Sequence, residues 1–348
     1  MTMATEIPRA PASDARPPYL ELIGMATAIW KARALYAAAH LGVVDLLAAE
    51  PQDVAALATR TGTHAPSLHR LLRALASFGV LTEAEPRRFA LTRLGAALRQ
   101  GAAGAARSTV LTLAGDWQWQ AWSHFLASLT TGKTGLAAAA GQDLFAYLAA
   151  HPQDGAHFDE AMVGLYGGLW PAVVAAWDFS PLKSVADIGG GVGLLLAEIL
   201  SAHPHMRGLL LEQEATVAKA RQVMQQRGLT RRCEIVTGDF FTAVPSGHDT
   251  YVLAHVLHDW DDAQCLSILR RCHEAMHRDA RLLIVETVLP AGDAPHPGKL
   301  LDLVMLTVTG GRERTEQEFA DLLAAAGLRL VRVVPTAAEQ SIVEAAAI

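Results

Sequence analysis

The pattern of apolar residues changes character near residue 180. Before that point apolar positions recur at helical spacing, and beyond it short β-branched or leucine-rich runs alternate with helical stretches. Alternation of this kind is typical of the βαβ units of a parallel doubly wound sheet. The sequence therefore predicts a helical N-terminal half followed by an α/β half.

The N-terminal half begins with three helices and a small hairpin. Residues 19–50 carry apolar residues at helical spacing, residues 53–62 form a helix with a cap signal at each end, and a strongly amphipathic helix covers residues 65–78. The runs 80–82 and 88–92 can pair as strands. Together these elements make a winged-helix pattern.

The rest of the chain supplies more helices and then the sheet. Residues 105–175 are helical and rich in tryptophan, and most of their aromatic side chains are expected to pack in a core. Thr315–Glu318 has the pattern of a capping box that opens a helix, which Gly327 closes. Strands are expected at residues 184–188, 207–212, 233–236, 249–255, 281–288, 328–334 and 341–345, with helices near 192–202, 214–227 and 262–277.

Composition narrows the class of protein. The 348 residues fit about two domains, and a hydrophobic fraction of 51% provides for a sizeable core. The net charge of −6 disfavours binding of nucleic acid over the whole surface, and no run approaches the ~18 apolar residues of a membrane span. The first eighteen residues lack the apolar core of a signal peptide. Three cysteines without metal-ligand spacing predict reduced thiols in a cytoplasmic protein: Cys233, Cys265 and Cys272.

A glycine-rich turn joins the first strand of the α/β half to its helix. Four glycines follow Asp187 and let the backbone approach a nucleotide-sized ligand: Gly189, Gly190, Gly191 and Gly193. A dinucleotide site needs a small residue where Leu194 stands. An acid followed by three spaced glycines is instead similar to S-adenosylmethionine sites.

Two later strand ends add polar groups to this turn. Glu212 ends the second strand, about 20 residues after the turn, where an acid accepts hydrogen bonds from ribose hydroxyls. Gly238, Asp239 and Phe240 follow the third strand, so that Asp239 can accept from an adenine amine and Phe240 can pack on the ring. The alternative for both acids is an ordinary solvated turn or helix cap.

The fourth strand ends in a segment that carries titratable groups. His258, Asp259 and Trp260 lie just past the strand, and open α/β sheets bind their ligands at that edge. A histidine in a loop can equally be a structural polar residue, and Asp261 or Asp262 can cap the next helix. These acids with His258 could also hold a metal ion, although their spacing does not support it.

Several motifs occur along the chain in an order that is typical of one protein family. They are Asp187–Gly193, Gly238–Phe240, His255–Asp262, Glu286 at the end of a strand, Asp302–Leu306 and Gly310–Phe319. With them the chain resembles the S-adenosylmethionine-dependent O-methyltransferases, which include the plant caffeate and flavonoid enzymes and bacterial enzymes that tailor aromatic natural products. The likeness covers nearly everything after residue 19. It departs at Ala254, where the plant enzymes commonly have a basic residue that helps to hold the cofactor.

The resemblance implies a fold and a division of the chain. The fold class is α/β, a Rossmann-like class I methyltransferase domain with an N-terminal helical winged-helix dimerisation domain. The expected segments are a disordered tail at residues 1–18, the dimerisation domain at 19–104, a helical linker and substrate-pocket region at 105–178, and a catalytic domain at 179–348.

The resemblance also implies a reaction. His258 is the expected general base, flanked by Glu286 and Glu313, and the predicted catalytic residues are these three. A phenol has a pKa near ~10, so an imidazole that takes its proton assists attack on the sulfonium methyl. The cofactor is S-adenosylmethionine, the product is S-adenosylhomocysteine, and no metal is needed for a single hydroxyl. Without the resemblance, Glu313 in its glycine turn is an ordinary surface charge.

The remaining expected contacts follow from the same likeness. Cofactor-binding residues are those of the glycine turn, Glu212, Gly238–Phe240 and Trp260. Residues expected to touch an aromatic substrate are Trp117, Phe158, Met162, Asp259, Met305 and Thr309. The partners are that small molecule and a second copy of the chain, with neither nucleic acid nor membrane.

Two other functions compete with methyl transfer to oxygen. A methyltransferase fold can support hydroxylation, decarboxylation or cyclisation, which retention of His258 with both acids disfavours. A winged-helix regulator could use the basic patch at residues 51–100, where Arg70 and Arg73 lie on the helix that would enter a DNA groove. Leucines on that same helix need burial, which disfavours this alternative.

Overall fold

The computed structural model describes residues 17–348 and divides the chain into two compact units, one up to Arg99 and one from Gln100 onward. The predicted tail, residues 1–18, lies outside the described residues except for Pro17 and Pro18. The region predicted separately at 105–178 belongs to the same compact unit as the sheet. Among the described residues, no helix has the length and apolar character needed to cross a membrane.

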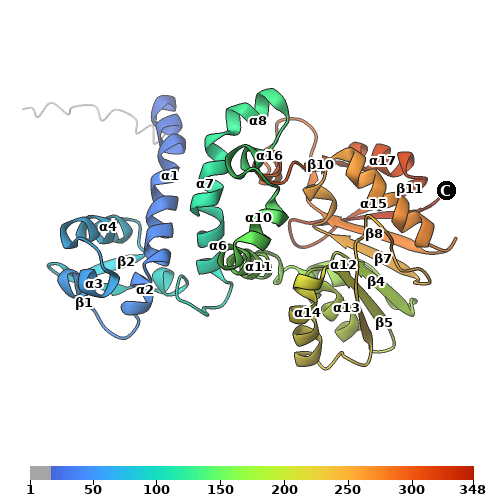
Figure 1. Ribbon diagram of the computed structural model, residues 1–348, viewed down its shortest axis with the longest axis horizontal. Coiled ribbons are helices and arrows are strands. Elements are labelled where there is room, and N and C mark those ends of the chain that lie inside the picture. The colour runs from blue at the N-terminus through green and yellow to red at the C-terminus, as the bar shows by residue number, and fades with distance from the viewer. Residues whose placement is uncertain (1–16) are drawn as a thin grey trace, which may run out of the picture. The chain divides into compact units, whose positions relative to one another are not determined.

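The first unit contains helices and a three-stranded antiparallel sheet of order β1-β3-β2 (Figure 1). Its elements are α1 (Pro18–His40), α2 (Val43–Leu46), β1 (Gln52–Asp53), α3 (Val54–Thr61), α4 (Ala65–Ser77), β2 (Leu81–Glu85), β3 (Arg88–Leu91) and α5 (Arg93–Ala96). The predicted caps of α3 are present, because Asp53 accepts from the backbone N–H of Ala55 at 2.7 Å and Gly62 takes a left-handed φ of 64°. Leu68, Leu72 and Leu75 of α4 are buried, as its amphipathic pattern predicts, and Leu71 is half-buried.

The helix α1 forms where apolar spacing predicts it, but most of the large apolar side chains in its N-terminal half stay exposed in a single chain. Trp30 is 72% exposed, Met25 71% and Leu22 67%. Exposed apolar side chains in such a row are characteristic of a surface that another protein covers. The helix therefore carries an apolar face that its own unit does not bury.

The second unit begins with a helical part. Its helices are α6 (Ala106–Leu113), α7 (Asp116–Ser123), α8 (Phe125–Thr131), α9 (Gly135–Ala140), α10 (Leu144–Ala150), α11 (Pro152–Tyr166) and α12 (Trp170–Ala176). A cluster of apolar side chains from α7, α9, α10 and α11 forms their core, and Val304 and Val308 from much later in the chain join it. The helical part is thus built on residues from both ends of this unit.

A seven-stranded sheet of order β11-β12-β8-β7-β4-β5-β6 forms the rest of the unit. Its strands are β4 (Ser184–Ile188), β5 (Arg207–Glu212), β6 (Cys233–Thr237), β7 (Thr250–Ala254), β8 (Arg281–Glu286), β11 (Leu328–Pro335) and β12 (Ser341–Ala347). The five earlier strands are parallel to one another, and β12 runs antiparallel to both of its neighbours. The two final strands complete the sheet as predicted.

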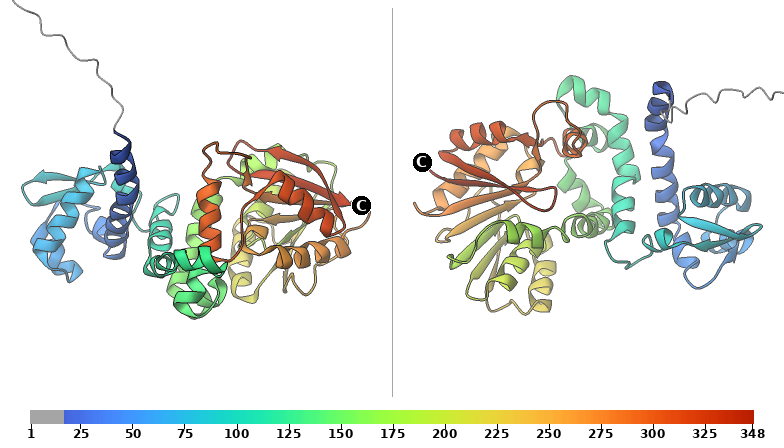
Figure 2. Two further views of the ribbon diagram at one scale, coloured as in Figure 1. Left: turned by 90° about the horizontal axis from the view of Figure 1, so that it is seen from above. Right: turned by 180° about the vertical axis from the view of Figure 1, so that it is seen from behind.

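Helices cover both faces of this sheet (Figures 1 and 2). Side chains of α12, α13 (Leu194–Ala202) and α14 (Glu214–Gln226) pack on one face, and those of α15 (Asp262–Ala275) and α17 (Glu316–Ala325) pack on the other. Neighbouring residues of β8 alternate between the two cores, Leu282 and Ile284 on one side and Leu283 and Val285 on the other. Because both faces are buried, the strands read as continuous apolar runs.

Two features differ from the sequence prediction. The expected strand 281–288 divides at Thr287, and the short β9 (Val288–Leu289) pairs in parallel with β10 (Arg314–Thr315). The helix α16 (Gly298–Val308) is not predicted, because Pro297 at its start makes no side-chain cap. Both elements bring distant parts of the chain to the carboxyl edge of the sheet.

Candidate active site

The glycine turn lies between β4 and α13 and requires glycine for two reasons. Gly189, Gly191 and Gly193 have φ values of 69°, 59° and 79°, a region that other residues rarely adopt. At Gly190 a Cβ would lie 2.2 Å from the Oδ2 atom of Asp187. The turn is therefore folded tightly over the carboxylate that precedes it.

Asp187 is buried under this turn, with 1% of its surface exposed. Neither of its carboxylate oxygens has a hydrogen-bond partner among the described residues. Burial, together with the nearby charge of Glu212, raises the pKa of Asp187 to about 7. A buried carboxylate without a partner favours a cationic or hydrogen-bond-donating ligand at this turn.

Glu212, at the end of β5, ties the glycine turn to the neighbouring strand. Its Oε2 atom accepts from the backbone N–H of Gly191 at 2.9 Å, and its Oε1 atom accepts from that of Gln213 at 2.8 Å. Burial raises the pKa of this carboxyl group. An ionised carboxylate has about four acceptor positions, so Glu212 can still accept from the hydroxyls of a ligand.

The residues after β6 lie beside the same turn. A Cβ at Gly189 would be 3.1 Å from the ring of Phe240, which places that ring against the turn. Asp239 accepts from the backbone N–H of Phe241 at 2.9 Å. This carboxylate therefore stabilises a turn, which was the alternative to a role in binding. Trp260 stacks on Phe145 with 5.7 Å between ring centroids. Aromatic rings and acceptors thus gather at the edge where a nucleoside is expected.

His258 lies in a one-turn 3₁₀ helix, η1 (Leu257–Asp259), just after β7. The residue is 7% exposed, and its Nδ1 atom lies 2.9 Å from the Oε1 atom of Glu313. A carboxylate only accepts, so Nδ1 carries the hydrogen and the lone pair of the neutral ring is on Nε2. The Nε2 atom is 3.8 Å from Asp259, too far for a hydrogen bond.

The charges around His258 set its proton affinity. Burial by itself lowers the pKa of this imidazole, but the charges of Glu286 and Asp259 and the hydrogen bond that the ring donates to Glu313 outweigh burial and raise the pKa to about 10. The ring is therefore a strong base once it is neutral. Among the described residues that act on its pKa, three are carboxylates and none is a cation.

The two acids expected to flank His258 have different roles in the structure. Glu286 is completely buried, and its Oε1 atom accepts from three successive backbone N–H groups, those of residues 256, 257 and 258 at 3.1, 3.0 and 3.3 Å. Its Oε2 atom lies 3.6 Å from Nδ1 of His258. Only Glu313 hydrogen-bonds the imidazole, whereas Glu286 mainly holds the backbone that carries it.

Glu313 is 2% exposed, which overturns the alternative of an ordinary surface charge. Its backbone N–H donates to Asp302 of α16 at 2.9 Å, and the following residue pairs with β9. Gly311 is equally constrained, because a Cβ there would lie 2.0 Å from the carbonyl oxygen of His258. The glycine turn 310–311 is pressed against the segment that carries the imidazole.

The residues expected to touch an aromatic substrate are spread over α7, α11, η1 and α16. Trp117 is 4% exposed and packs in the core of the helical part, where Phe158 joins it. Met305 is 7% exposed, and Thr309 donates to its backbone carbonyl at 3.1 Å. Met162 is half-buried on α11. Their contact with a substrate remains a prediction.

Sequence reasoning did not single out His255. Its φ of 52° is left-handed, its ring stacks on Tyr166 with 4.0 Å between centroids, and neither ring nitrogen has a hydrogen-bond partner among the described residues. Burial lowers its pKa well below the ordinary value. His255, His258 and Glu286 offer donor atoms within 4.8 Å of one another, a geometry compatible with a metal ion. The motif His-Val-Leu-His was a possible signal for this pair.

Two of the three acids in the metal alternative foreseen at residues 258–262, Asp261 and Asp262, are engaged elsewhere. Asp261 caps α15 in a full capping box with Gln264, as one prediction had it. Asp262 pairs with Arg314 at 2.7 Å. Both carboxylates are therefore engaged in structural contacts.

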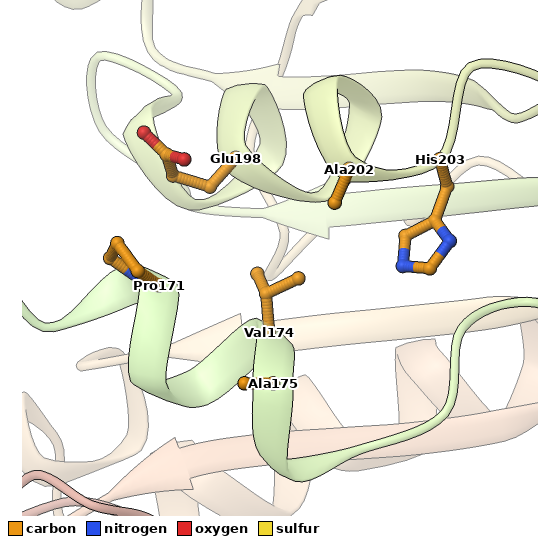
Figure 3. A pocket seen from close by; sticks show the side chains of 6 residues that line it. All are labelled: Pro171, Val174, Ala175, Glu198, Ala202 and His203. Carbon is orange, nitrogen blue, oxygen red and sulfur yellow. The ribbon is translucent and has the colours of Figure 1, made fainter.

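A hollow of about 480 Å³ lies elsewhere on this unit, between α12 and α13 (Figure 3). None of the predicted site residues contributes to its lining, which is apolar apart from Glu198 and His203. The lining residues are Pro171, Val174, Ala175, Glu198, Ala202 and His203. Glu198 is paired with Arg227 at 3.0 Å. The chemistry described above is therefore separate from this hollow.

The sheet with its antiparallel last strand, the glycine turn and the acid at the end of β5 define a class I methyltransferase. Residues 122–329 match the model of the O-methyltransferase domain, and residues 23–101 match that of the O-methyltransferase dimerisation domain. The chain belongs to the S-adenosylmethionine-dependent O-methyltransferase family, which confirms the family, fold class and cofactor predicted from the sequence.

Relatives support this placement over nearly the whole chain. The chain is 45% identical to phenazine O-methyltransferase PhzM of Lysobacter antibioticus over 93% of its length and 95% of that protein. It is 40% identical to the mitomycin biosynthesis 6-O-methyltransferase of Streptomyces lavendulae, covering 89% and 88%. The crystal structure of LaPhzM superposes with a TM-score of 0.91 at 45% identity, covering 96% of this chain and all of that one.

One relative transfers the methyl group to a different element. The phenazine-1-carboxylate N-methyltransferase of Pseudomonas aeruginosa is 32% identical, over 93% of this chain and 96% of that protein. Membership of the family therefore does not by itself fix the acceptor atom.

Proposed function

We propose that the protein transfers the methyl group of S-adenosylmethionine to a phenolic hydroxyl of an aromatic small molecule in natural-product biosynthesis, with His258 as general base. The observation that carries this proposal is the 2.9 Å hydrogen bond between His258 and Glu313. It fixes the hydrogen on Nδ1 and leaves Nε2 free to accept a proton.

The proton affinities of base and acceptor support the proposal. The pKa of His258 is raised to about 10, and a phenol has a pKa near ~10, so transfer of the proton between them is nearly balanced. S-adenosylmethionine supplies an electrophilic methyl on a positively charged sulfur, and that charge favours the neutral form of His258. Once the ring is protonated, Glu313 stabilises the imidazolium.

A base of this kind favours oxygen over nitrogen as the acceptor atom. An aromatic amine already has an uncharged lone pair, whereas a phenol must lose a proton to become a good nucleophile. The buried His258–Glu313 pair is therefore useful for hydroxyl acceptors and dispensable for amines. The same pair disfavours a diverged activity that does not require removal of a proton.

The residues of the glycine turn fit the cofactor. Glu212 has acceptor positions left for the ribose hydroxyls, and Asp187 is a buried carboxylate to which no residue in the described part of the chain donates a hydrogen bond. The amino group of the methionine end would lie on the side of Asp187, and the adenine on the side of Phe240. The predicted cofactor-binding residues are consistent with this orientation.

The exposed apolar face of α1 supports a homodimer through the N-terminal unit. Matching of this unit to the dimerisation domain and exposures of about 70% at Met25 and Trp30 favour a second copy as its cover. Light scattering on the full chain is expected to give twice the mass of 37.1 kDa. A monomer at micromolar concentration would contradict the proposed dimer.

The test of the function is a panel of aromatic hydroxyl and amino compounds with wild type and with His258→Ala. Methylated product is followed by mass spectrometry, and hydroxyphenazines are included because a relative is a phenazine O-methyltransferase. We expect methylation of hydroxyls, and a loss of about 10²–10⁴-fold in His258→Ala. Binding of S-adenosylhomocysteine by calorimetry is expected to stay unchanged. Full activity of the variant would refute the role of His258.

A further inference from the structure

Arg314 is one of the most completely buried large side chains of the protein, at 1% exposure. A guanidinium never loses its charge in practice, so it must be paired where it is buried. Its Nη1 atom donates to the carbonyl of Leu257 at 3.1 Å, and its Nη2 atom donates to that of Trp260 at 3.2 Å. Arg314 therefore bonds the backbone on both sides of His258.

The other side of the same backbone segment is held by Glu286. Its Oε1 atom accepts from the N–H groups of residues 256, 257 and 258. The peptide groups of Leu257 are thus bonded on one side to a buried carboxylate and on the other to a buried guanidinium. Hydrogen bonds to charged groups are about twice as strong as neutral ones, so this segment is held firmly.

Arg314 is itself anchored by a surface acid. Its Nη2 and Nε atoms donate to the Oδ1 atom of Asp262 at 2.7 and 3.2 Å, and Nη2 also lies 3.3 Å from the sulfur of Cys265. Asp262 opens α15, directly after the His258 segment. The planar fork of an arginine can satisfy several acceptors at once, which a lysine ammonium cannot do in the same geometry.

Arg314 is close in the chain or in the sheet to both acids that flank His258. Arg314 directly follows Glu313, the hydrogen-bond partner of His258, and pairs through β10 with Val288, two residues after Glu286. We propose that Arg314 is a positioning residue which, with Glu286, clamps the backbone of residues 256–260 and so holds His258 at bonding distance from Glu313. The proposal rests on the function proposed above, in which His258 is the base.

The first test reads the clamp without any acceptor. We would follow the ring carbon of His258 by NMR through a pH titration in wild type, Arg314→Lys and Arg314→Met. Both variants are expected to lose the hydrogen bond between His258 and Glu313, which should lower the pKa of His258. Arg314→Met also removes a positive charge, which would raise that pKa, so a fall cannot be an effect of charge. A wild-type titration in Arg314→Lys would overturn the proposal.

The second test asks whether Arg314 acts through Glu313. In a wild-type background, Arg314→Lys is expected to reduce kcat by roughly 10–100-fold, because a displacement near 1 Å costs about that much, and to leave the Kd for S-adenosylhomocysteine within ~3-fold. In a Glu313→Gln background the same change is expected to have almost no effect on kcat. Equal losses in both backgrounds would mean a general structural role and overturn the proposal.

Two further variants keep the test decisive. If Arg314→Lys loses its near-ultraviolet circular dichroism, Asp262→Asn replaces it, since that side chain is 56% exposed and is not one of the charges that set the pKa of His258. It should lower that pKa in the same direction, and an unchanged titration would overturn the proposal. The matched control is Arg312→Met, which removes an exposed arginine bound to the same Asp262 and should titrate like wild type.

The outcomes for the clamp and for the proposed function are distinguishable. If His258 is not the base, His258→Ala remains active while Arg314→Lys still lowers the pKa of His258. If His258 is the base but the clamp is absent, His258→Ala is inactive and the titration of His258 is the same in Arg314→Lys as in wild type. The NMR readout is therefore independent of catalysis.

Discussion

The two halves of the proposed active site differ in how far their polar groups are already bonded within the protein. In the donor half, formed by Asp187–Gly193 and Glu212, one carboxylate has no hydrogen-bond partner within residues 17–348 and the other keeps acceptor positions free. In the reacting half, formed by His258, Glu286, Glu313 and Arg314, each of the four side chains has at least one hydrogen bond to protein, and the second oxygens of Glu286 and Glu313 have no hydrogen-bond partner among the described residues. The donor half leaves bonds for a ligand to make, whereas the reacting half is organised beforehand.

This difference suits the two tasks. A cofactor must bind and leave in each cycle, so a site with unfilled acceptors gains affinity from the ligand itself. A base acts only if its ring is already oriented, since reorganisation during the reaction adds to the barrier. Changes in the reacting half should therefore alter the rate at saturating ligand, and changes in the donor half should alter affinity.

The largest expected effect is in the reacting half, in Glu313→Gln. Losing one negative charge lowers the pKa of His258, so the neutral and active ring persists at lower pH. The acid limb of kcat/KM should move to lower pH, while the plateau of kcat falls by roughly 10–100-fold because the ring is less basic and less well held. A pH–rate profile checks both. An acid limb at the wild-type position would contradict the assigned pair.

A smaller effect is expected in the donor half, in Glu212→Ala. The ribose hydroxyls lose an acceptor and the glycine turn loses its bond at Gly191, so the Kd for S-adenosylhomocysteine should rise by roughly 10-fold. At saturating cofactor, kcat should remain within a few-fold of wild type. Calorimetry and saturation kinetics separate the two numbers. An unchanged Kd, or a collapse of kcat alone, would remove the distinction between the halves.

The smallest expected effect is on the stability of the free protein, in Asp187→Asn. The pKa of Asp187 is raised in the folded state, to about 7, so the folded state binds more protons than the unfolded state between pH 4 and 7. Stability attributable to this group is lost as pH rises through that range. At pH 8 the free energy of unfolding of the variant should exceed that of wild type by up to about 2 kcal/mol. This difference should disappear near pH 4. Chemical denaturation at both pH values measures it, and equal curves would show that the carboxylate is not strained.

The elements that the sequence predicted best carry their signals locally. Asp53, Thr315 and the glycines after the helices are caps whose action spans a few residues, and each is found at its helix end. The helix α16 escaped prediction because it lacks such a cap, and its position is set by packing against the helical part. Local rules therefore describe most of the sheet domain and miss what long-range packing decides.

The same limit applies within the site. His258 stands out because its position after a strand is visible in the sequence, and the resemblance supplied Glu313. The burial of Glu313 could not be read from a charged residue in a glycine turn, since burial there depends on the contact of Gly311 with the His258 segment. Arg314 lies in the Gly310–Phe319 motif, but its role depends on two backbone carbonyls that only the fold brings to it.

The left-handed backbone of His255 has a consequence for the substitutions that this position can accept. A glycine would relieve the strain of a φ of 52°, but it would uncover one face of Tyr166 and leave a void beside His258. Larger aromatic residues would fill the void and retain the strain. A change at this position therefore trades backbone strain against packing, so the shape of the segment that carries His258 depends on a ring three residues before it.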